Sequence, residues 1–186
     1  MKRILAFAVT VMIFLSMVIS ALPVNAAPKL NQYDQNNKLI LYNGFSEYAV
    51  DGAYGTSVNS APSPGAIMQA TFKDCTTIEL YGGRGIDRAY ADIYVDDELV
   101  ESINTYSATT ERNVLLYKVS GLTRGEHVLK VVVSKTKDNA SVGTWVEVDM
   151  VASDGVLMEK KLQIKDPEEG NQIIDDSLLS YEGDWT

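Results

Sequence analysis

The sequence predicts an all-β protein, and within that class an antiparallel β-sandwich of the jelly-roll type. Apolar and polar residues alternate with a period of two in residues 77–81 and 89–95, the pattern of strands with one buried face. Other short apolar segments follow at intervals of roughly 8–12 residues, separated by Gly, Pro, Ser, Asn or Asp. After the N-terminal segment, no stretch makes a convincing helix. This pattern favours a sandwich or barrel over an alternating α/β fold.

Residues 1–26 have the features of a signal peptide. A basic start precedes an apolar run, Ile4–Ile19, and Val24-Asn25-Ala26 offers small residues where a signal peptidase cuts. The alternative, a membrane anchor, is disfavoured because the run is short for a bilayer span of ~20 residues and Pro23 follows it. We expect cleavage after Ala26, no membrane insertion of the mature chain, and a secreted, extracellular or cell-surface location.

The mature chain is expected to begin with a flexible lead-in, because residues 27–37 are polar and irregular. The β-sandwich domain is expected over residues 38–155. Turn-forming residues separate its eight candidate strands. These are Leu39–Tyr42, Ala66–Phe72, Thr77–Tyr81, Ala89–Val95, Leu99–Asn104, Asn113–Val119, Glu126–Ser134 and Thr144–Ser153.

The clearest element is a hairpin. The strand Ala89–Val95 is followed by Asp96-Asp97 and then by a second apolar segment. Aspartate tolerates left-handed backbone angles better than most residues, so this pair suits a tight turn. Val128–Val133 and the Val146, Val148, Met150 series are rich in β-branched or apolar side chains, which predicts central strands that carry the core.

The chain changes character after Ser153. Residues 156–175 contain a charged segment with a Pro and a Gly and are interpreted as a linker. In residues 176–186, Leu178, Tyr181 and Gly183 repeat an earlier Leu-Tyr-Gly spacing, which suggests the first strand of a truncated second copy. The polypeptide would then be a fragment of a longer tandem protein. The alternative is a tail strand of the first domain.

Charge and cysteine content limit the partners. The formal charge is −9, and signal cleavage removes two more basic residues, so nucleic acid and anionic lipid are not expected partners. Cys75 is the only cysteine, which excludes an internal disulfide. With only a lysine nearby to lower its pKa, Cys75 is interpreted as a bystander rather than a reactive thiol.

Few residues suit catalysis. The single histidine, His127, shares the strand parity of Leu129 and is expected to point inward and be hydrogen-bonded there. The sequence has no Gly-x-Ser-x-Gly motif and no ligand cluster around the histidine, which disfavours serine hydrolases and zinc enzymes. A glycosidase needs only two carboxylates, and the 25 acidic residues leave that alternative open.

Residues suited to recognition are more plentiful. The chain has ten tyrosines and two tryptophans, several of them in loops or on the polar parity of strands. A flat ring can stack on the apolar face of a sugar while nearby polar groups bond its hydroxyls. The alternative for each ring is packing under a loop. The aromatic residues chosen as ligand-binding candidates are Tyr54, Tyr106 and Trp145.

Two polar candidates join these rings. Arg84 lies in Gly82-Gly83-Arg84-Gly85, where glycines permit a sharp turn and close approach. Its guanidinium could bind sugar hydroxyls or a carboxylate, or form a structural ion pair with Asp149 or Asp87. Asp51 lies in a loop, Asp51-Gly52-Ala53-Tyr54-Gly55, whose composition suits a binding loop, a calcium site or a simple turn.

Three segments in order resemble the galactose-binding-like β-sandwich modules of secreted proteins: ELYGGRGIDRAYADIYVDDELV, VSGLTRGEHVLKVVV and GTWVEVD. The resemblance extends from about Leu39 to Ser153. The Gly82–Gly85 corner, His127 and Trp145 match the pattern. The resemblance implies a jelly-roll sandwich with ligand loops at one end. It also implies a structural calcium ion in many members, although no ligand set transfers to this chain.

Together these features predict a secreted, non-catalytic carbohydrate-binding module that targets a glycoside hydrolase to polysaccharide or glycan. The hydrolase would be a catalytic domain in the same chain or in a partner chain. Two alternatives stay open. One is a structural or adhesive spacer of a cell-surface protein, which would bury its rings. The other is a small esterase or glycosidase. No cofactor besides calcium is expected.

Overall fold

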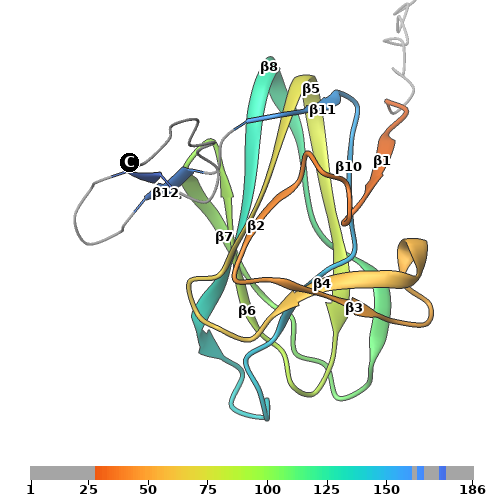
Figure 1. The fold of residues 1–186 in the computed structure, drawn as a ribbon, viewed down its shortest axis with the longest axis vertical. Coiled ribbons are helices and arrows are strands. Elements are labelled where there is room, and N and C mark those ends of the chain that lie inside the picture. The colour runs from red at the N-terminus through yellow and green to blue at the C-terminus, as the bar shows by residue number, and fades with distance from the viewer. Residues whose placement is uncertain (1–27, 161–162, 166–171, 175–186) are drawn as a thin grey trace, which may run out of the picture.

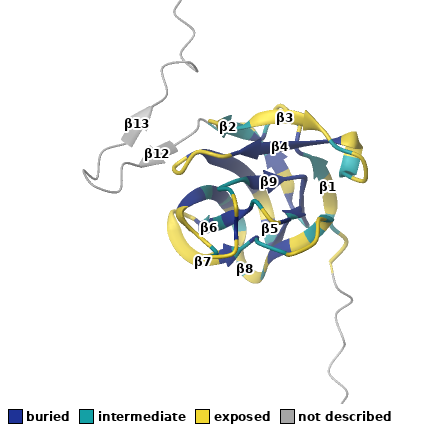
Figure 2. Ribbon diagram, turned by 90° about the horizontal axis from the view of Figure 1, so that it is seen from below, coloured by how far each residue is buried: buried dark blue, intermediate teal, exposed yellow. Residues whose placement is uncertain are grey.

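The computed structural model describes residues 28–160, 163–165 and 172–174. Two antiparallel sheets enclose an apolar core (Figures 1 and 2). The only helical element in these residues is a short 3₁₀ turn, η1 (Tyr54–Thr56). The predicted all-β, antiparallel jelly-roll sandwich is therefore confirmed. In this part of the chain, no helix has the length and apolar character that crossing a membrane requires.

The larger sheet is built around β5 (Ile67–Arg84). Its strand order is β1-β10-β5-β8-β6-β7, and β2 and β11 pair with β5 beside this path. The bounds of the other strands are β1 Asn31–Asp34, β2 Leu41–Asn43, β6 Ala89–Val95, β7 Glu98–Asn104, β8 Glu111–Lys137, β10 Met150–Ser153 and β11 Val156–Met158.

The smaller sheet has the order β3 (Ser46–Ala49), β4 (Ser57–Ala61) and β9 (Val146–Val148). Its central strand β4 is buried along its whole length, whereas β3 is exposed (Figure 2). The strands β12 (Gln163–Lys165) and β13 (Gln172–Ile174) form a separate antiparallel pair.

β6 shows how the period-two pattern produces a sandwich strand. Its bounds are those predicted, and its residues alternate between buried and half-buried. Asp96 and Asp97 follow with φ angles of 52° and 68°, so the predicted turn through left-handed aspartates is confirmed. The next strand, β7, is mostly exposed and forms an edge of the larger sheet (Figure 2).

Two strands are longer than predicted. β5 joins the segments expected as Ala66–Phe72 and Thr77–Tyr81, and register shifts between Phe72 and Thr77 mark the join. Asp74 has a φ of 56° there. An irregularity of this kind bends a strand without ending it, so one strand serves both halves of the sandwich. β8 likewise joins two predicted strands.

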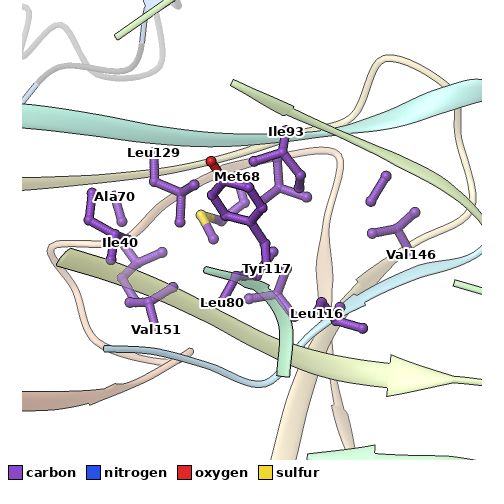
Figure 3. Packing of buried hydrophobic residues seen from close by; sticks show 14 of the residues in the cluster. Ile40, Met68, Ala70, Leu80, Ile93, Leu116, Tyr117, Leu129, Val146 and Val151 are labelled. Carbon is purple, nitrogen blue, oxygen red and sulfur yellow. The ribbon is translucent and has the colours of Figure 1, made fainter. Parts of the chain in front are cut away.

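The core lies between the sheets. Met68, Leu80, Ile93 and Leu129 are fully buried and come from β5, β6 and β8 (Figure 3). Val146 of β9 belongs to the same cluster, so the smaller sheet closes the core from its other side. Burying each such side chain contributes roughly 1.5–3 kcal/mol relative to exposure.

The domain boundaries differ from the predicted ones. Asn31–Asp34, expected in the flexible lead-in, is β1 and pairs with β10. Val156–Met158, expected in the linker, is β11 and pairs with β5. The sandwich therefore extends beyond 38–155 at both ends. The predicted signal peptide and residues 176–186, the predicted second copy, lie outside the described residues.

Candidate functional site

A cleft of about 240 Å³ opens where the smaller sheet meets the β5–β6 loop. Strands β3, β4 and β9 contribute one side, and the β5–β6 loop and the start of β8 contribute the other. The lining residues are Tyr48, Val50, Val58, Ser60, Asp87, Arg88, Arg112, Trp145 and Glu147.

An aromatic pair forms part of the wall. The rings of Tyr48 and Trp145 meet edge to face, with centroids 5.7 Å apart and an interplanar angle of 85°. The backbone of Trp145 is fixed on both sides, because its N–H donates to Asp87 O and its carbonyl accepts from Ala89 N. Tyr48 is 44% exposed. The pair therefore offers an accessible tyrosine ring beside a tryptophan whose backbone is fixed.

A buried carboxylate organises the charged side of the cleft. Glu147 is 2% exposed. Its Oε2 accepts from Arg88 Nη2 at 2.5 Å and from Arg112 Nη1 at 2.8 Å. Arg88 also pairs with Asp87 at 3.2 Å. The Arg112 side chain is 32% exposed, so one edge of its guanidinium is fixed while the rest stays accessible. Such a held arginine suits hydrogen-bonding to a ligand.

The glycines before Arg84 make room for Glu147. A Cβ on Gly82 would lie 2.2 Å from the carbonyl oxygen of Glu147, and one on Gly83 would lie 2.2 Å from its Oε1. Neither glycine has a positive φ. Close approach of β9, rather than the sharp turn that the sequence suggested, is therefore the reason for glycine at these two positions.

Of the five predicted ligand-binding residues, Trp145 alone lines the cleft. Tyr54 and Asp51 belong to the loop that contains η1, which adjoins it: a Cβ on Gly52 would lie 4.0 Å from Cβ of Arg112. The N–H of Tyr54 donates to Asp149 Oδ1 at 2.9 Å, and Asp51 is exposed. This loop reaches the cleft through Val50, whereas Asp51 and Tyr54 do not line it.

Arg84 and Tyr106 lie elsewhere at the same end of the sandwich. Within the described residues, Arg84 forms no ion pair with Asp149 or Asp87, the two partners suggested for the structural alternative. Its Nε is buried and has no hydrogen-bond partner there. Tyr106 is bridged to Gly85 through the backbone. Neither side chain reaches the cleft lining.

Sequence reasoning did not select Tyr48, Arg88, Arg112 or Glu147. One signal was available: Glu147 interrupts an otherwise apolar strand, Val146–Val148, and shares the parity of Trp145. An acidic residue at such a position needs a buried cationic partner. The partners, however, come from distant parts of the chain and are found only in the fold.

The carboxylates of Asp34 and Asp149 lie next to η1 and are the candidate ligands for the predicted calcium ion. Asp149 is fully buried, and its Oδ2 has no partner among the described residues. Burial raises the pKa of this carboxyl to about 6. Asp34 Oδ2 lies 1.8 Å from where a Cβ on Gly55 would sit, so it approaches the same turn. Oxygen donors of this kind fit calcium. No group of three or more His, Cys, Asp or Glu gathers in the described residues, so calcium stays a prediction.

No protein-family model matches the chain. Two enzymes of Flavonifractor plautii match part of it. The A type blood alpha-D-galactosamine galactosaminidase is 30% identical over 106 residues, which is 56% of this chain and 10% of the enzyme. The A type blood N-acetyl-alpha-D-galactosamine deacetylase is 26% identical over 111 residues, 59% of this chain and 14% of the enzyme. The chain thus spans only about a tenth to a seventh of these relatives.

Among solved structures, a family two carbohydrate esterase from Cellvibrio japonicus matches with a TM-score of 0.50 at 12% identity, over 73% of this chain and 37% of the esterase. A two-domain esterase active on acetylated mannans matches with a TM-score of 0.50 at 17% identity, over 77% and 42%. A carbohydrate-binding module, CBM36, solved with calcium and xylotriose, has a TM-score of 0.44 at 14% identity, over 69% and 99%. The two esterases show a shared fold.

The structural neighbours include carbohydrate-binding modules and domains of carbohydrate esterases. The specific likeness to galactose-binding-like modules stays a prediction.

Proposed function

We propose that this chain is a secreted, non-catalytic carbohydrate-binding module and that the cleft beside Trp145 is its sugar site. The module would hold an attached or partner glycoside hydrolase close to polysaccharide or glycan. The esterases and the Flavonifractor plautii enzymes, each much longer than this chain, support an accessory role next to a catalytic domain.

The observation that carries the proposal is the aromatic pair next to a fixed arginine. A sugar ring has an apolar C–H face bordered by hydroxyls. Tyr48 and Trp145 offer the aromatic surface, and the accessible edge of Arg112 offers N–H donors beside it. This arrangement favours binding over the spacer alternative, because a spacer would bury its rings, whereas Tyr48 is 44% exposed.

The catalytic alternative has less support. His127 and Cys75 do not line the cleft, and burial raises the pKa of the Cys75 thiol, which disfavours the reactive thiolate. The buried acid of the cleft, Glu147, accepts hydrogen bonds from two arginines through Oε2, which suits a structural role better than proton transfer to a substrate. We expect no sustained hydrolysis of aryl esters or aryl glycosides. Turnover that disappears in Asp87→Asn or Glu147→Gln would reinstate the enzyme alternative.

Isothermal titration against a panel of glycans tests the proposal. We expect binding in the micromolar to millimolar range and a loss of about tenfold or more, ~1.4 kcal/mol, in Trp145→Ala and in Arg112→Ala. Tyr106→Ala is the matched control, since this tyrosine lies at the same end of the sandwich but outside the cleft. Circular dichroism would show that each variant is folded. If no glycan binds at millimolar concentration, or if folded Trp145→Ala binds as well as the parent chain, the proposal is wrong.

A further inference from the structure

Two exposed apolar residues, Ile86 and Val142, lie on segments that also contribute lining residues to the cleft. Val142 is 74% exposed, more than any other large apolar residue described, and Ile86 is 52% exposed. They occupy paired backbone positions, because Val142 N donates to Ile86 O at 2.9 Å. Asp87 follows Ile86, and Trp145 lies three residues after Val142. These two residues are also paired, because Trp145 N donates to Asp87 O at 3.0 Å, and both line the cleft.

The two segments are packed too closely for the apolar pair to be an accident of a loose loop. A Cβ on Gly143 would lie 2.7 Å from Asp87 O and 3.0 Å from Asp87 Cβ. Val142 and Ile86 are therefore held at a fixed position relative to Asp87. The structure therefore places a fixed, exposed apolar pair on the segments beside Asp87, which lines the cleft.

The apolar surface formed by Ile86 and Val142 is too small to bind a protein partner by itself. A stable protein interface needs about 800 Å² from each partner, far more than two side chains supply. A small apolar substituent on a ligand already held in the cleft needs only a contact of this size. Continuity with the cleft therefore favours a substituent of the sugar over a protein partner.

The carboxylate of Asp87, beside the apolar pair, indicates which substituent of a sugar would fit. Asp87 is 43% exposed, and only its Oδ1 is engaged, by Arg88. Its Oδ2 accepts no hydrogen bond from the described residues. An acetamido group carries an N–H for such a carboxylate and a methyl for the apolar pair. A free amine would use the carboxylate alone, and a plain hydroxyl would leave the apolar pair uncovered.

We propose that the cleft prefers sugars with an N-acetyl substituent, whose amide N–H donates to Asp87 and whose methyl packs on Ile86 and Val142. This inference rests on the proposed sugar-binding function and names the class of sugar. It assigns Ile86 and Val142, which do not line the cleft itself, as specificity residues.

Titration with three forms of one hexose skeleton tests the inference: the N-acetylhexosamine, the free hexosamine and the parent hexose, each as its methyl glycoside. We expect the N-acetyl form to bind about tenfold more tightly than the hexose, the scale of one apolar group in a partly enclosed site. Val142→Ser should reduce this preference severalfold while leaving the affinity for the hexose unchanged. The substituted side chain is exposed, so the variant is expected to fold normally.

The outcomes separate this inference from the proposed function. If the N-acetyl form and the hexose bind equally and Trp145→Ala weakens both, the N-acetyl preference is wrong but the sugar site is supported. Tightest binding of the free amine also overturns it, because an ion pair with Asp87 would then dominate. Equal loss of both sugars in Val142→Ser shows a general contact rather than specificity. If none of the three sugars and no glycan of the wider panel binds, both proposals are wrong.

Discussion

At the scale of single residues, His127 shows how two acceptors fix a protonation state. Its Nδ1 lies 2.6 Å from Asp96 Oδ2, and its Nε2 lies 2.6 Å from the carbonyl oxygen of Thr123. Both partners are acceptors, so both ring nitrogens must donate, which only the imidazolium can do. The prediction of an inward, hydrogen-bonded histidine is confirmed. Its bonds tie the turn between β6 and β7 to β8.

This geometry predicts a pH-dependent stability. Burial alone would lower the pKa of His127, but the bonds to Thr123 and Asp96 and the charge of Asp96 raise it above its ordinary value. A raised pKa means that the folded state holds the proton more tightly, so the stabilisation is complete below ~6.5 and is lost as pH rises through the folded pKa. We expect guanidinium unfolding to give a lower free energy of unfolding at pH 8.5 than at pH 6.5.

His127→Gln is the matched control for this prediction, because it has no group that titrates in this range. The window also avoids Asp149, whose pKa of about 6 makes stability fall with rising pH mainly below pH 6. The neighbouring ion pair of Lys130 on β8 with Asp97 is the same in both proteins. An equal pH dependence in the parent chain and in His127→Gln would contradict the assignment.

At the scale of elements, the approach of β5 to β9 depends on the absence of side chains at Gly82 and Gly83. A Cβ on Gly82 would also lie 2.7 Å from Leu116 Cδ1, so backbone and core would both have to move. We expect Gly82→Ala to lower the free energy of unfolding by about 1–3 kcal/mol, as overpacking does. Chemical denaturation measures this loss.

Gly125→Ala provides the comparison. Its Cβ would meet only Thr123 O, at 3.7 Å, an ordinary contact, and no positive φ is involved. This substitution should change stability little. If the two variants lose equal stability, the close approach of β9 is not what requires glycine at position 82.

The elements differ in how far sequence could predict them. β6 was predicted with its bounds because one face is apolar and the turn residues follow at once. β4 was missed because its residues are mostly small and polar, and their burial depends on distant partners. Gln35 donates to Ser57 Oγ at 2.7 Å and its carbonyl accepts from Asn59 at 3.3 Å. The cleft was predicted only through Trp145 for the same reason: Arg88, Arg112 and Glu147 meet through the fold.

At the scale of the whole molecule, the two carboxylates beside η1 connect distant parts of the chain. Asp34 ends β1, and Asp149 directly precedes β10, so an ion between them would join the first strand of the sandwich to one near its end. We expect calcium to raise the melting temperature by several degrees. Ligand at 100 times its Kd stabilises by about 2.7 kcal/mol, and in a protein of this size each kcal/mol is worth about 2–4 °C.

Asp149→Asn should abolish the calcium-dependent shift, and Asp51→Asn should preserve it. Asp51 belongs to the same loop but is exposed and therefore tests whether charge near the turn is sufficient. Differential scanning calorimetry with calcium, magnesium or a chelator measures the shift. A melting temperature unchanged by millimolar calcium would rule out a structural ion at Asp34 and Asp149.

The pairing of β1 with β10 has a consequence for assembly into larger proteins. Asn31 lies opposite Ser153 and donates to Gly155 O, so the start of the sandwich lies beside the connection between β10 and β11. In Figure 1 the start of β1 and the end of β10 lie in the upper half of the molecule, whereas β3 and β4 lie in the lower half. A neighbouring domain fused before β1 would therefore be attached on the side opposite the cleft. The sandwich would extend outward from such a neighbour, with the Trp145 face directed away from it.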